Sequence, residues 1–315
     1  MKLSIVIPVY NEESGISHFL DSLKRSMDDF EPSIELEIIV VNDGSIDKTS
    51  ERVIEFDWAQ IKLIELISNA GHMGALEAGL NYTSGDLVIT MDGDQQHPPK
   101  YISEMVKIQY ETQCDVVLGL RVRGSETSFL RRKISEGFYK LLSVATDISI
   151  QNNGGEFRLM TRQVVDELIR LRESQKVYRF LISQLGFKIE TFNFQTPPRM
   201  YGESKYSIKH LWKLGIHSLI GFSTVPLTAI FLGGLTIFVI SMFYLIFLLI
   251  SYFFGNVLPG WTSLSVLIVG LASLQIMAIG IIGRYISQLL IETRQRPRYI
   301  VRSIHNSLRK SQTDE

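Results

Sequence analysis

Two carboxylates separated by a single residue follow directly on an apolar run. The run is Leu87–Met91, and Asp92, Asp94 and Gln96 come after it. In an extended chain side chains alternate between faces, so these three would point the same way. Converging oxygen ligands suit Mg²⁺ or Mn²⁺ and leave coordination positions open for a diphosphate. The alternative is an acidic strand-to-helix loop, in which Asp94 or Gln96 caps the helix that follows Pro98–Pro99.

The elements that position these residues are apolar runs alternating with amphipathic segments. The expected strands are Leu3–Val9, Glu35–Val41, Ile61–Leu66, Asp86–Met91 and Asp115–Leu120, and the expected helices are Ser14–Phe30, Lys48–Phe56, Gly74–Tyr82 and Pro98–Glu111. Alternation with short connections predicts an α/β fold with a doubly wound, mostly parallel sheet. In such sheets ligands bind beyond the carboxyl ends of the strands.

Polar clusters follow several of these strands. Tyr10–Glu12 comes after the first, Asn42–Gly44 after the second and Arg121 after the fifth. The carboxylates of Glu12 and Asp43 could accept hydrogen bonds from a base or a ribose. Equally, Asp43 could stabilise its own turn and Glu12 could supply negative charge to a helix N-terminus. The sequence has no glycine-rich phosphate loop, so a metal would have to carry the phosphate charge.

Two long segments of the C-terminal half contain no charged residue. They are Pro226–Phe254 and Thr262–Gly283, joined by a short link rich in turn formers. A helix needs roughly 20 residues to cross a bilayer, so the pattern predicts a transmembrane hairpin with spans at about 227–254 and 263–290. The alternative is a pair of buried core helices. Glycines in the second span would allow close helix packing, either within the hairpin or in a homo-oligomer.

The flanks of the hairpin are basic, whereas its link carries no Lys or Arg. The positive-inside rule therefore predicts an integral membrane protein with both termini and the N-terminal domain in the cytoplasm. The apolar run at Leu3–Val9 is too short for a signal peptide. Basic amphipathic segments at 121–142 and 206–222 suit helices in the headgroup region, although an ordinary surface helix also explains the first.

Length and composition set the organisation. A chain of 315 residues fits one domain of about 200 residues and a membrane module. The expected parts are a cytoplasmic domain at 1–200, an interfacial helix at 201–225, the hairpin at 226–291 and a basic tail at 292–315. A net charge of −1 argues against nucleic acid as the main partner. The single cysteine, Cys114, fits a reducing compartment.

The order of several short motifs resembles one protein family. These motifs are Ile5–Glu13, Val41–Ser45, Asp92–Pro99, Gly155–Met160, Gly202–Tyr206 and Gly283–Ile286 with Arg296–Tyr299. Over essentially its whole length the chain resembles the membrane-anchored polyprenyl-phosphate glycosyltransferases of glycosyltransferase family 2. That group includes the bactoprenol glucosyltransferases and dolichol-phosphate mannosyltransferase.

The resemblance implies a glycosyltransferase-A fold, a nucleotide-sugar donor and a polyprenyl phosphate acceptor. It implies roles for the positions that match the family motifs. The nucleotide would be bound by Pro8, Tyr10, Glu12, Asp43 and Asp92, and Mg²⁺ or Mn²⁺ by Asp92, Asp94 and Gln96. The lipid phosphate or diphosphate would be bound by Arg121, Arg131, Arg199 and Lys205, and catalysis would fall to Asp94, Glu156 and Arg158. Two positions depart from the family pattern. Glu156 stands where members often have Asp, and Asn153 stands where many have Asp.

The chemistry of the implied acceptor favours a simple reaction. A phosphate monoester has a second pKa near 6, so it is largely dianionic at pH 7 and needs little deprotonation to attack a sugar. We therefore expect direct displacement with inversion, and by analogy with the two-span branch a UDP-linked hexose such as glucose. A processive polysaccharide synthase is disfavoured because the chain lacks a Gln-x-x-Arg-Trp segment and has one hairpin. A non-catalytic scaffold or flippase partner is disfavoured by the complete set of motif residues.

Overall fold

The computed structural model describes residues 1–28, 30, 34–122, 154–171, 173, 176–195, 232–233, 236, 239–240, 243, 260–294 and 296–306 of the chain. The chain divides into two compact units. The first comprises residues 1–139, 148–205 and 295–315, and the second comprises residues 140–147 and 206–294.

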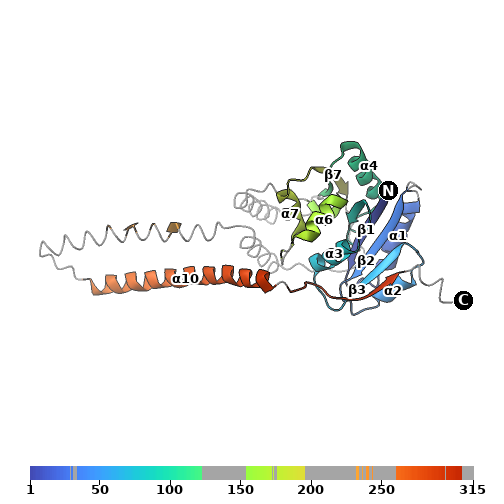
Figure 1. Cartoon of the computed structure of the whole chain (residues 1–315). Helices are drawn as coiled ribbons and strands as arrows, with labels where there is room; N and C mark the ends of the chain where they lie inside the picture. The colour runs from blue at the N-terminus through green and yellow to red at the C-terminus, as the bar shows by residue number, and fades with distance from the viewer. Residues whose placement is uncertain are drawn as a thin grey trace. The chain divides into compact units, whose positions relative to one another are not determined.

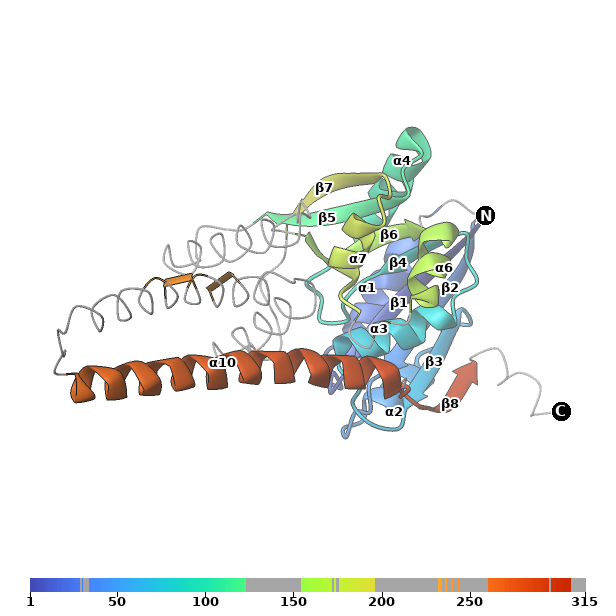
Figure 2. The same cartoon turned by 60° about the vertical axis from the view of Figure 1, so that its left-hand side comes forward.

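The first unit is built on a mixed eight-stranded sheet with the order β7-β5-β6-β4-β1-β2-β3-β8. The strands are β1 (Lys2–Val9), β2 (Glu35–Asn42), β3 (Ile61–Leu66), β4 (Leu87–Thr90), β5 (Val116–Val122), β6 (Gly154–Thr161), β7 (Ile189–Gln195) and β8 (Val301–Asn306). Figure 1 shows β1, β2 and β3 side by side, and Figure 2 shows β7 and β8 at opposite ends of the sheet.

The central strands run parallel, as the sequence predicts. Strand β1 pairs in parallel with β2 and β4, and β2 pairs in parallel with β3. Strand β6 lies antiparallel between β4 and β5. Neither β6 nor the edge strand β8, which pairs antiparallel with β3, was predicted. The prediction of a mostly parallel α/β sheet is confirmed.

Helices cover both faces of the sheet. The elements are α1 (Ile16–Asp28), α2 (Thr49–Glu55), α3 (His72–Asn81), the 3₁₀ turn η1 (Pro99–Tyr101), α4 (Ile102–Thr112), α6 (Arg162–Arg170) and α7 (Tyr178–Gln184). On β1, Ile5 and Ile7 pack in the core that contains α1 and α4, whereas Val6 packs with α3, α6 and α7. Burial on both faces explains the unbroken apolar run of this strand.

The chain turns sharply after β4, which corrects the extended geometry and the helix cap expected for this segment. Strand β4 ends at Thr90, and Gln95 has a φ of 66°. Residues 92–96 are therefore not extended, and strand alternation does not align their side chains. The helical segment starts after Pro98, which occupies the N-cap position. The alternative, in which Asp94 or Gln96 caps that helix, is therefore wrong.

Close packing explains why glycine stands in this turn. A Cβ atom on Gly93 would lie 2.8 Å from Val9 Cγ1 at the end of β1. A side chain there would collide with the neighbouring strand, so only glycine lets the backbone pass. The turn is thereby held against the end of β1.

The second unit contains α10 (Trp261–Arg294), a continuous helix of 34 residues. The second predicted span falls within this helix, whereas most of the first, with the segment at 206–222, lies outside the described residues. In the part of the chain that the structure describes, no helix meets the combined requirement of length and apolarity for crossing a membrane. The transmembrane hairpin stays a prediction.

The segment after α10 belongs to the first unit. Strand β8 completes the sheet, and Arg298 Nη1 lies 3.2 Å from Glu77 Oε2 on α3. Buried Lys176 contacts the same carboxylate, with 2.8 Å between its Nζ and Glu77 Oε1. These contacts join α3, the approach to α7 and the C-terminal segment.

Candidate active site

The carboxyl ends of β1, β2 and β4 meet at one edge of the sheet. Val9 pairs with Asn42 at the last position of the β1–β2 ladder, and Thr90 ends β4 on the other side of β1. The backbone N–H of Asp43 donates to the carbonyl of Val9 over 2.9 Å. The residues after these strands are therefore neighbours, as expected for a ligand site in this class of sheet.

Two of the segments at this edge bond directly to each other. They are residues 10–13 and 42–49, which we call the paired loops. The N–H groups of Asn11 and Glu12 donate to Ser45 Oγ and Thr49 Oγ1, both over 2.9 Å, and Ile46 N–H donates back to Asn11 Oδ1 over 3.0 Å. Asn11 has a φ of 53°, a conformation that asparagine tolerates well. Many small contacts fix the relative position of the two segments.

The carboxylate of Asp43 anchors a third segment. Its Oδ1 accepts from the N–H of Ala70 over 2.6 Å, and the side chain is buried. Burial raises the pKa of this carboxyl, while the N–H groups of Ala70 and Gly71 pull it in the opposite direction. Asp43 thus ties the paired loops to the loop before α3 rather than closing its own turn.

Asp92 lies between a histidine at the start of α3 and a histidine later in its own loop. His72 Nε2, at the start of α3, is 3.6 Å from Asp92 Oδ1, and His97 Nδ1 is 3.6 Å from Oδ2. Asp92 and His72 are about one-third exposed, whereas His97 is buried. Desolvation lowers the pKa of His97, against the opposing effect of Asp92 and other nearby carboxylates.

Residues 92–97 form a turn of their own, which we call the acidic turn. The N–H of Gln96 donates to Asp94 Oδ1 over 3.1 Å, and the N–H of Asp92 donates to His97 Nδ1 over 2.9 Å. Both carboxylates are partly exposed. The turn therefore places two carboxylates at the sheet edge, and hydrogen bonds within the turn help to hold it.

A buried ion pair lies on β6 beside the end of β4. Arg158 bonds to Glu156 through Nη2 and Oε2, and Arg158 is 1% exposed. Thr90 pairs with Arg158 in the ladder, and its hydroxyl donates to the carbonyl of Glu156 over 2.6 Å. Tyr178 is also buried, and desolvation together with the charges of Glu77 and Glu156 raises its pKa.

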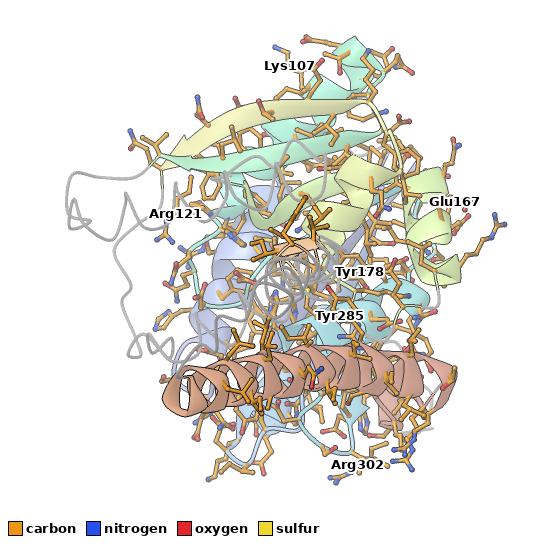
Figure 3. All side chains as sticks on the ribbon, turned by 90° about the vertical axis from the view of Figure 1, so that its left-hand side faces the viewer. Lys107, Arg121, Glu167, Tyr178, Tyr285 and Arg302 are labelled. Atoms are coloured by element: carbon orange, nitrogen blue, oxygen red, sulfur yellow. The ribbon has the colours of Figure 1, made fainter. Side chains whose placement is uncertain are left out.

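Arg121 is exposed near the end of β5 and lies at the margin of the sheet in Figure 3. Leu118 pairs with Arg158, and Arg158 pairs with Thr90, so Arg121, the last residue but one of β5, lies toward the same edge as Asp92. Arg131, Arg199 and Lys205 lie outside the described residues. So do Asn153 and most of the basic segment at 121–142.

The donor atoms of the acidic turn suit a hard divalent cation. Asp92 and Asp94 supply partly exposed carboxylate oxygens, the ligand type that Mg²⁺ and Mn²⁺ prefer. Among the described residues, no group of three or more His, Cys, Asp or Glu side chains is placed to hold a metal ion. A cation here would take only part of its coordination shell from such side chains, with the rest from phosphate, water or amide oxygens.

The comparison with known families decides the class of the chain. Residues 4–169 match Glycosyl transferase family 2. The chain belongs to glycosyltransferase family 2. It is a glycosyltransferase, and the matched region contains the paired loops, the acidic turn and the ion pair on β6.

Relatives of this glycosyltransferase align with it from end to end. An uncharacterized glycosyltransferase of Bacillus subtilis, YkcC, is 35% identical over 304 residues, covering 96% of this chain and 93% of the relative. The bactoprenol glucosyl transferase of Shigella phage SfX is 36% identical over 307 residues, covering 96% and 99%.

The fold of this glycosyltransferase is that of solved glycosyltransferase-A proteins. A crystal structure of glucosyl-3-phosphoglycerate synthase from Mycobacterium tuberculosis, in complex with Mn²⁺, UDP-glucose and phosphoglyceric acid, superposes with a TM-score of 0.50. The two are 18% identical, and the match covers 70% of this chain and 77% of that chain. At this identity the likeness shows the fold alone.

Several residues of the glycosyltransferase site were not predicted. His72 and His97 flank Asp92, and Tyr178 lies buried close enough to Glu156 for its pKa to respond to that charge. His97 stands within the acidic motif, five residues after Asp92, so its spacing was visible in the sequence. Nothing in the sequence pattern pointed to Tyr178, since it comes from a helix far along the chain.

Proposed function

We propose that the chain transfers one hexose, glucose, from UDP-glucose to a polyprenyl phosphate at the cytoplasmic face of a membrane. The observation that carries the proposal is the end-to-end alignment with a bactoprenol glucosyl transferase, 36% identical over 99% of that protein. The position of the acidic turn and the paired loops at one sheet edge supports it. The solved glycosyltransferase whose fold matches holds UDP-glucose and Mn²⁺.

The paired loops are proposed to bind the nucleoside. Their backbone is fixed by mutual hydrogen bonds, so a base or ribose would meet a site already in place. Pro8, Tyr10, Glu12 and Asp43 lie within or beside them. Asp43 places a buried carboxylate at this edge, and the N–H of Ala70 holds it in position through Oδ1.

The acidic turn is proposed to face the diphosphate. Asp92 and Asp94 would hold Mg²⁺ or Mn²⁺, with Gln96 beside them. When bound, such a cation neutralises the charge that develops on the departing nucleoside diphosphate. The protein side chains contribute placement, because both carboxylates stand on a turn that is held against β1 at Gly93.

The acceptor is proposed to attack without a dedicated base. One phosphate oxygen forms a bond to the anomeric carbon, and the bond from that carbon to the diphosphate oxygen breaks, which releases UDP. The acceptor is already dianionic near pH 7, so no proton has to be removed. Glu156 is ion-paired with Arg158, so it would take part as the carboxylate of a pair without net charge rather than as a free base. Exposed Arg121 would attract phosphate through its guanidinium.

The proposed acceptor is a lipid, so the chain would work at a bilayer surface. The charge-free segments 226–254 and 262–283 and their basic flanks support a membrane anchor with both termini in the cytoplasm. This placement would bring the basic residues Arg199 and Lys205 close to the headgroups.

The test uses the full-length chain purified in detergent, with radiolabelled UDP-glucose, undecaprenyl phosphate and either Mg²⁺ or Mn²⁺. We expect label in the organic extract as a single sugar on lipid, released by mild acid, and no transfer after EDTA treatment. Polymer in place of a glycolipid would favour the processive synthase. Absence of lipid-linked label with UDP-, GDP- and dTDP-sugars alike would overturn the proposal.

A further inference from the structure

His97 is placed to fix the backbone from which Asp92 projects. We infer that His97 is a positioning residue that holds Asp92 through its backbone N–H rather than through its carboxylate. The inference deepens the proposed function, since it rests on a metal and diphosphate role for the acidic turn. It assigns to a buried side chain of the motif a task distinct from ligand binding.

The imidazole of His97 is itself firmly held. Its ring stacks on Phe157 with centroids 5.0 Å apart and planes 11° apart, and Phe194 meets it edge-on at 5.8 Å. The residue is 6% exposed. Phe157 belongs to β6 and Phe194 to β7, so two strands of the sheet determine the position of the ring. A rigid acceptor of this kind can fix the group that donates to it.

The hydrogen-bond pattern decides how His97 acts. The N–H of Asp92 donates to Nδ1 over 2.9 Å, so the lone pair of this nitrogen is engaged and its proton, in the neutral ring, is on Nε2. Nδ1 therefore has no proton to donate to Asp92 Oδ2, which lies 3.6 Å away. His97 fixes the backbone of Asp92 and leaves both carboxylate oxygens to other partners.

The bond from Asp92 to His97 acts together with two other restraints on the acidic turn. The turn is confined at Gly93, where the chain passes close to Val9, and Asp94 Oδ1 closes the local loop on the N–H of Gln96. The bond from Asp92 to His97 joins the two ends of the turn. Without it, the Cα of Asp92 is released and the relative position of both carboxylates changes.

Two substitutions separate positioning from simple packing. Asparagine at 97 offers Oδ1 near the place of Nδ1 but loses the ring, whereas phenylalanine keeps the ring and loses the acceptor. A packing role predicts that His97→Phe is the milder change. A positioning role predicts the opposite order for every measurement that reports on Asp92, with His97→Asn closer to the parent. If His97→Phe does not fold, His97→Gln, which cannot place its oxygen at Nδ1, takes its place.

The first measurement needs no ligand. Hydrogen exchange is followed by mass spectrometry in peptides that cover residues 88–98 of the full-length parent and variants. We expect one amide more to exchange early in His97→Phe than in the parent, and parent-like protection in His97→Asn. Unchanged protection in His97→Phe, with its thermal unfolding close to that of the parent, would overturn the inference.

The second measurement follows Mn²⁺ binding in the presence of UDP, by loss of the free-ion signal in electron paramagnetic resonance. Loss of a residue that hydrogen-bonds to a metal ligand typically lowers metal affinity by 10–100-fold. We therefore expect about that loss of Mn²⁺ affinity in His97→Phe and a loss of about threefold or less in His97→Asn. Equal Mn²⁺–UDP affinity in parent and His97→Phe would refute the positioning role. A parent that binds no Mn²⁺ with UDP would refute the proposed function, while the exchange experiment still decides on His97.

Discussion

The paired loops and the acidic turn lie at the same edge of the sheet but are held in different ways. In the paired loops, backbone N–H groups of one segment find side-chain acceptors on the other, and Asp43 adds a third segment. In the acidic turn, the N–H of Asp92 donates to His97 Nδ1 and the N–H of Gln96 donates to Asp94 Oδ1, so these two bonds close one segment on itself. The first region is joined across separate segments of the chain, whereas these bonds of the second region lie within one segment.

This difference has a consequence for substitutions. A single lost hydrogen bond costs about 0.5–1.5 kcal/mol, which several remaining bonds can absorb. Where bonds within one segment fix a charged group that must meet its ligand closely, a small displacement changes activity strongly and stability little. We therefore expect function to be most sensitive at the acidic turn and β6, and least sensitive within the paired loops.

The largest effect is expected at Asp94. Asp94→Asn keeps an oxygen that can accept from the N–H of Gln96 but removes the negative charge. We expect lipid glucosylation to fall by about 100-fold or more. Loss of a side chain that binds the metal itself should cost at least as much as loss of a residue that only hydrogen-bonds to such a side chain. The melting temperature should stay within a few degrees of the parent, as measured by thermal unfolding in detergent. Full activity in the folded variant would show that this turn does not serve the reaction.

The next effect concerns the ion pair on β6. Arg158→Met leaves Glu156 as a poorly compensated charge, and breaking a buried pair typically costs about 3–5 kcal/mol. Since Glu156 is slightly more exposed than Arg158, we expect the lower end of this range in chemical unfolding. Activity should be lost as well.

The double variant Glu156→Gln with Arg158→Met serves as the control. Removing both charges should restore much of the stability, because no unpaired charge remains. Restored stability without restored glucosylation would assign the pair to the reaction. Recovery of both would make the pair purely structural and would remove β6 from the sensitive region.

Local sequence patterns predicted much of the fold, and the strands that they missed were missed for physical reasons. Strand β3 occupies the predicted residues, and β1 and β2 differ from prediction by one residue at one end. Their apolar runs are buried on both faces, which makes the signal strong. Strands β6 and β8 were missed because their positions depend on partners far along the chain. Strand β6 pairs with β4 and β5, and β8 pairs with β3.

At the candidate site the structure corrects the predicted geometry, while the roles of the predicted residues stay predictions. Asp92 and Asp94 do lie beyond β4, but a turn places them, because Gly93 must pass Val9 and strand alternation ends at Thr90. His97 stands five residues after Asp92 in the sequence, whereas His72 comes from the start of α3, and no short-range pattern encodes its contact with Asp92. Glu156 was expected as a catalytic residue, and the structure adds its buried partnership with Arg158.

A moderate effect is expected for Asp43 in the paired loops. Folding raises the pKa of the Asp43 carboxyl above its unfolded value of about 3.9, so the protonated form favours the folded state. This stabilisation is fully present below the unfolded pKa and is lost as the pH rises through the folded pKa. Asp43→Asn keeps an oxygen for the N–H of Ala70 and removes the buried charge. We expect stability at pH 7 to be equal or slightly higher, with a flatter dependence on pH above 4.

If Asp43 accepts a hydrogen bond from the base or ribose, the same variant should bind UDP about tenfold more weakly. A hydrogen bond to a charged group contributes about 1.5–3 kcal/mol, and the asparagine oxygen keeps part of that interaction. Titration calorimetry with UDP and Mn²⁺ measures this. Weaker binding together with undiminished stability would separate the binding task of Asp43 from its structural one. Unchanged affinity would confine Asp43 to joining the loops.

The smallest effect is expected at Ser45, where the paired loops contact each other. Ser45→Ala removes the acceptor for the N–H of Asn11 but leaves the bonds from Glu12 to Thr49 and from Ile46 to Asn11. We expect a loss of about 1 kcal/mol in stability and a change of about threefold or less in KM for the donor, measured by initial rates of glycolipid formation. A change as large as that of Asp94→Asn would contradict shared support, because one bond would then fix the paired loops by itself.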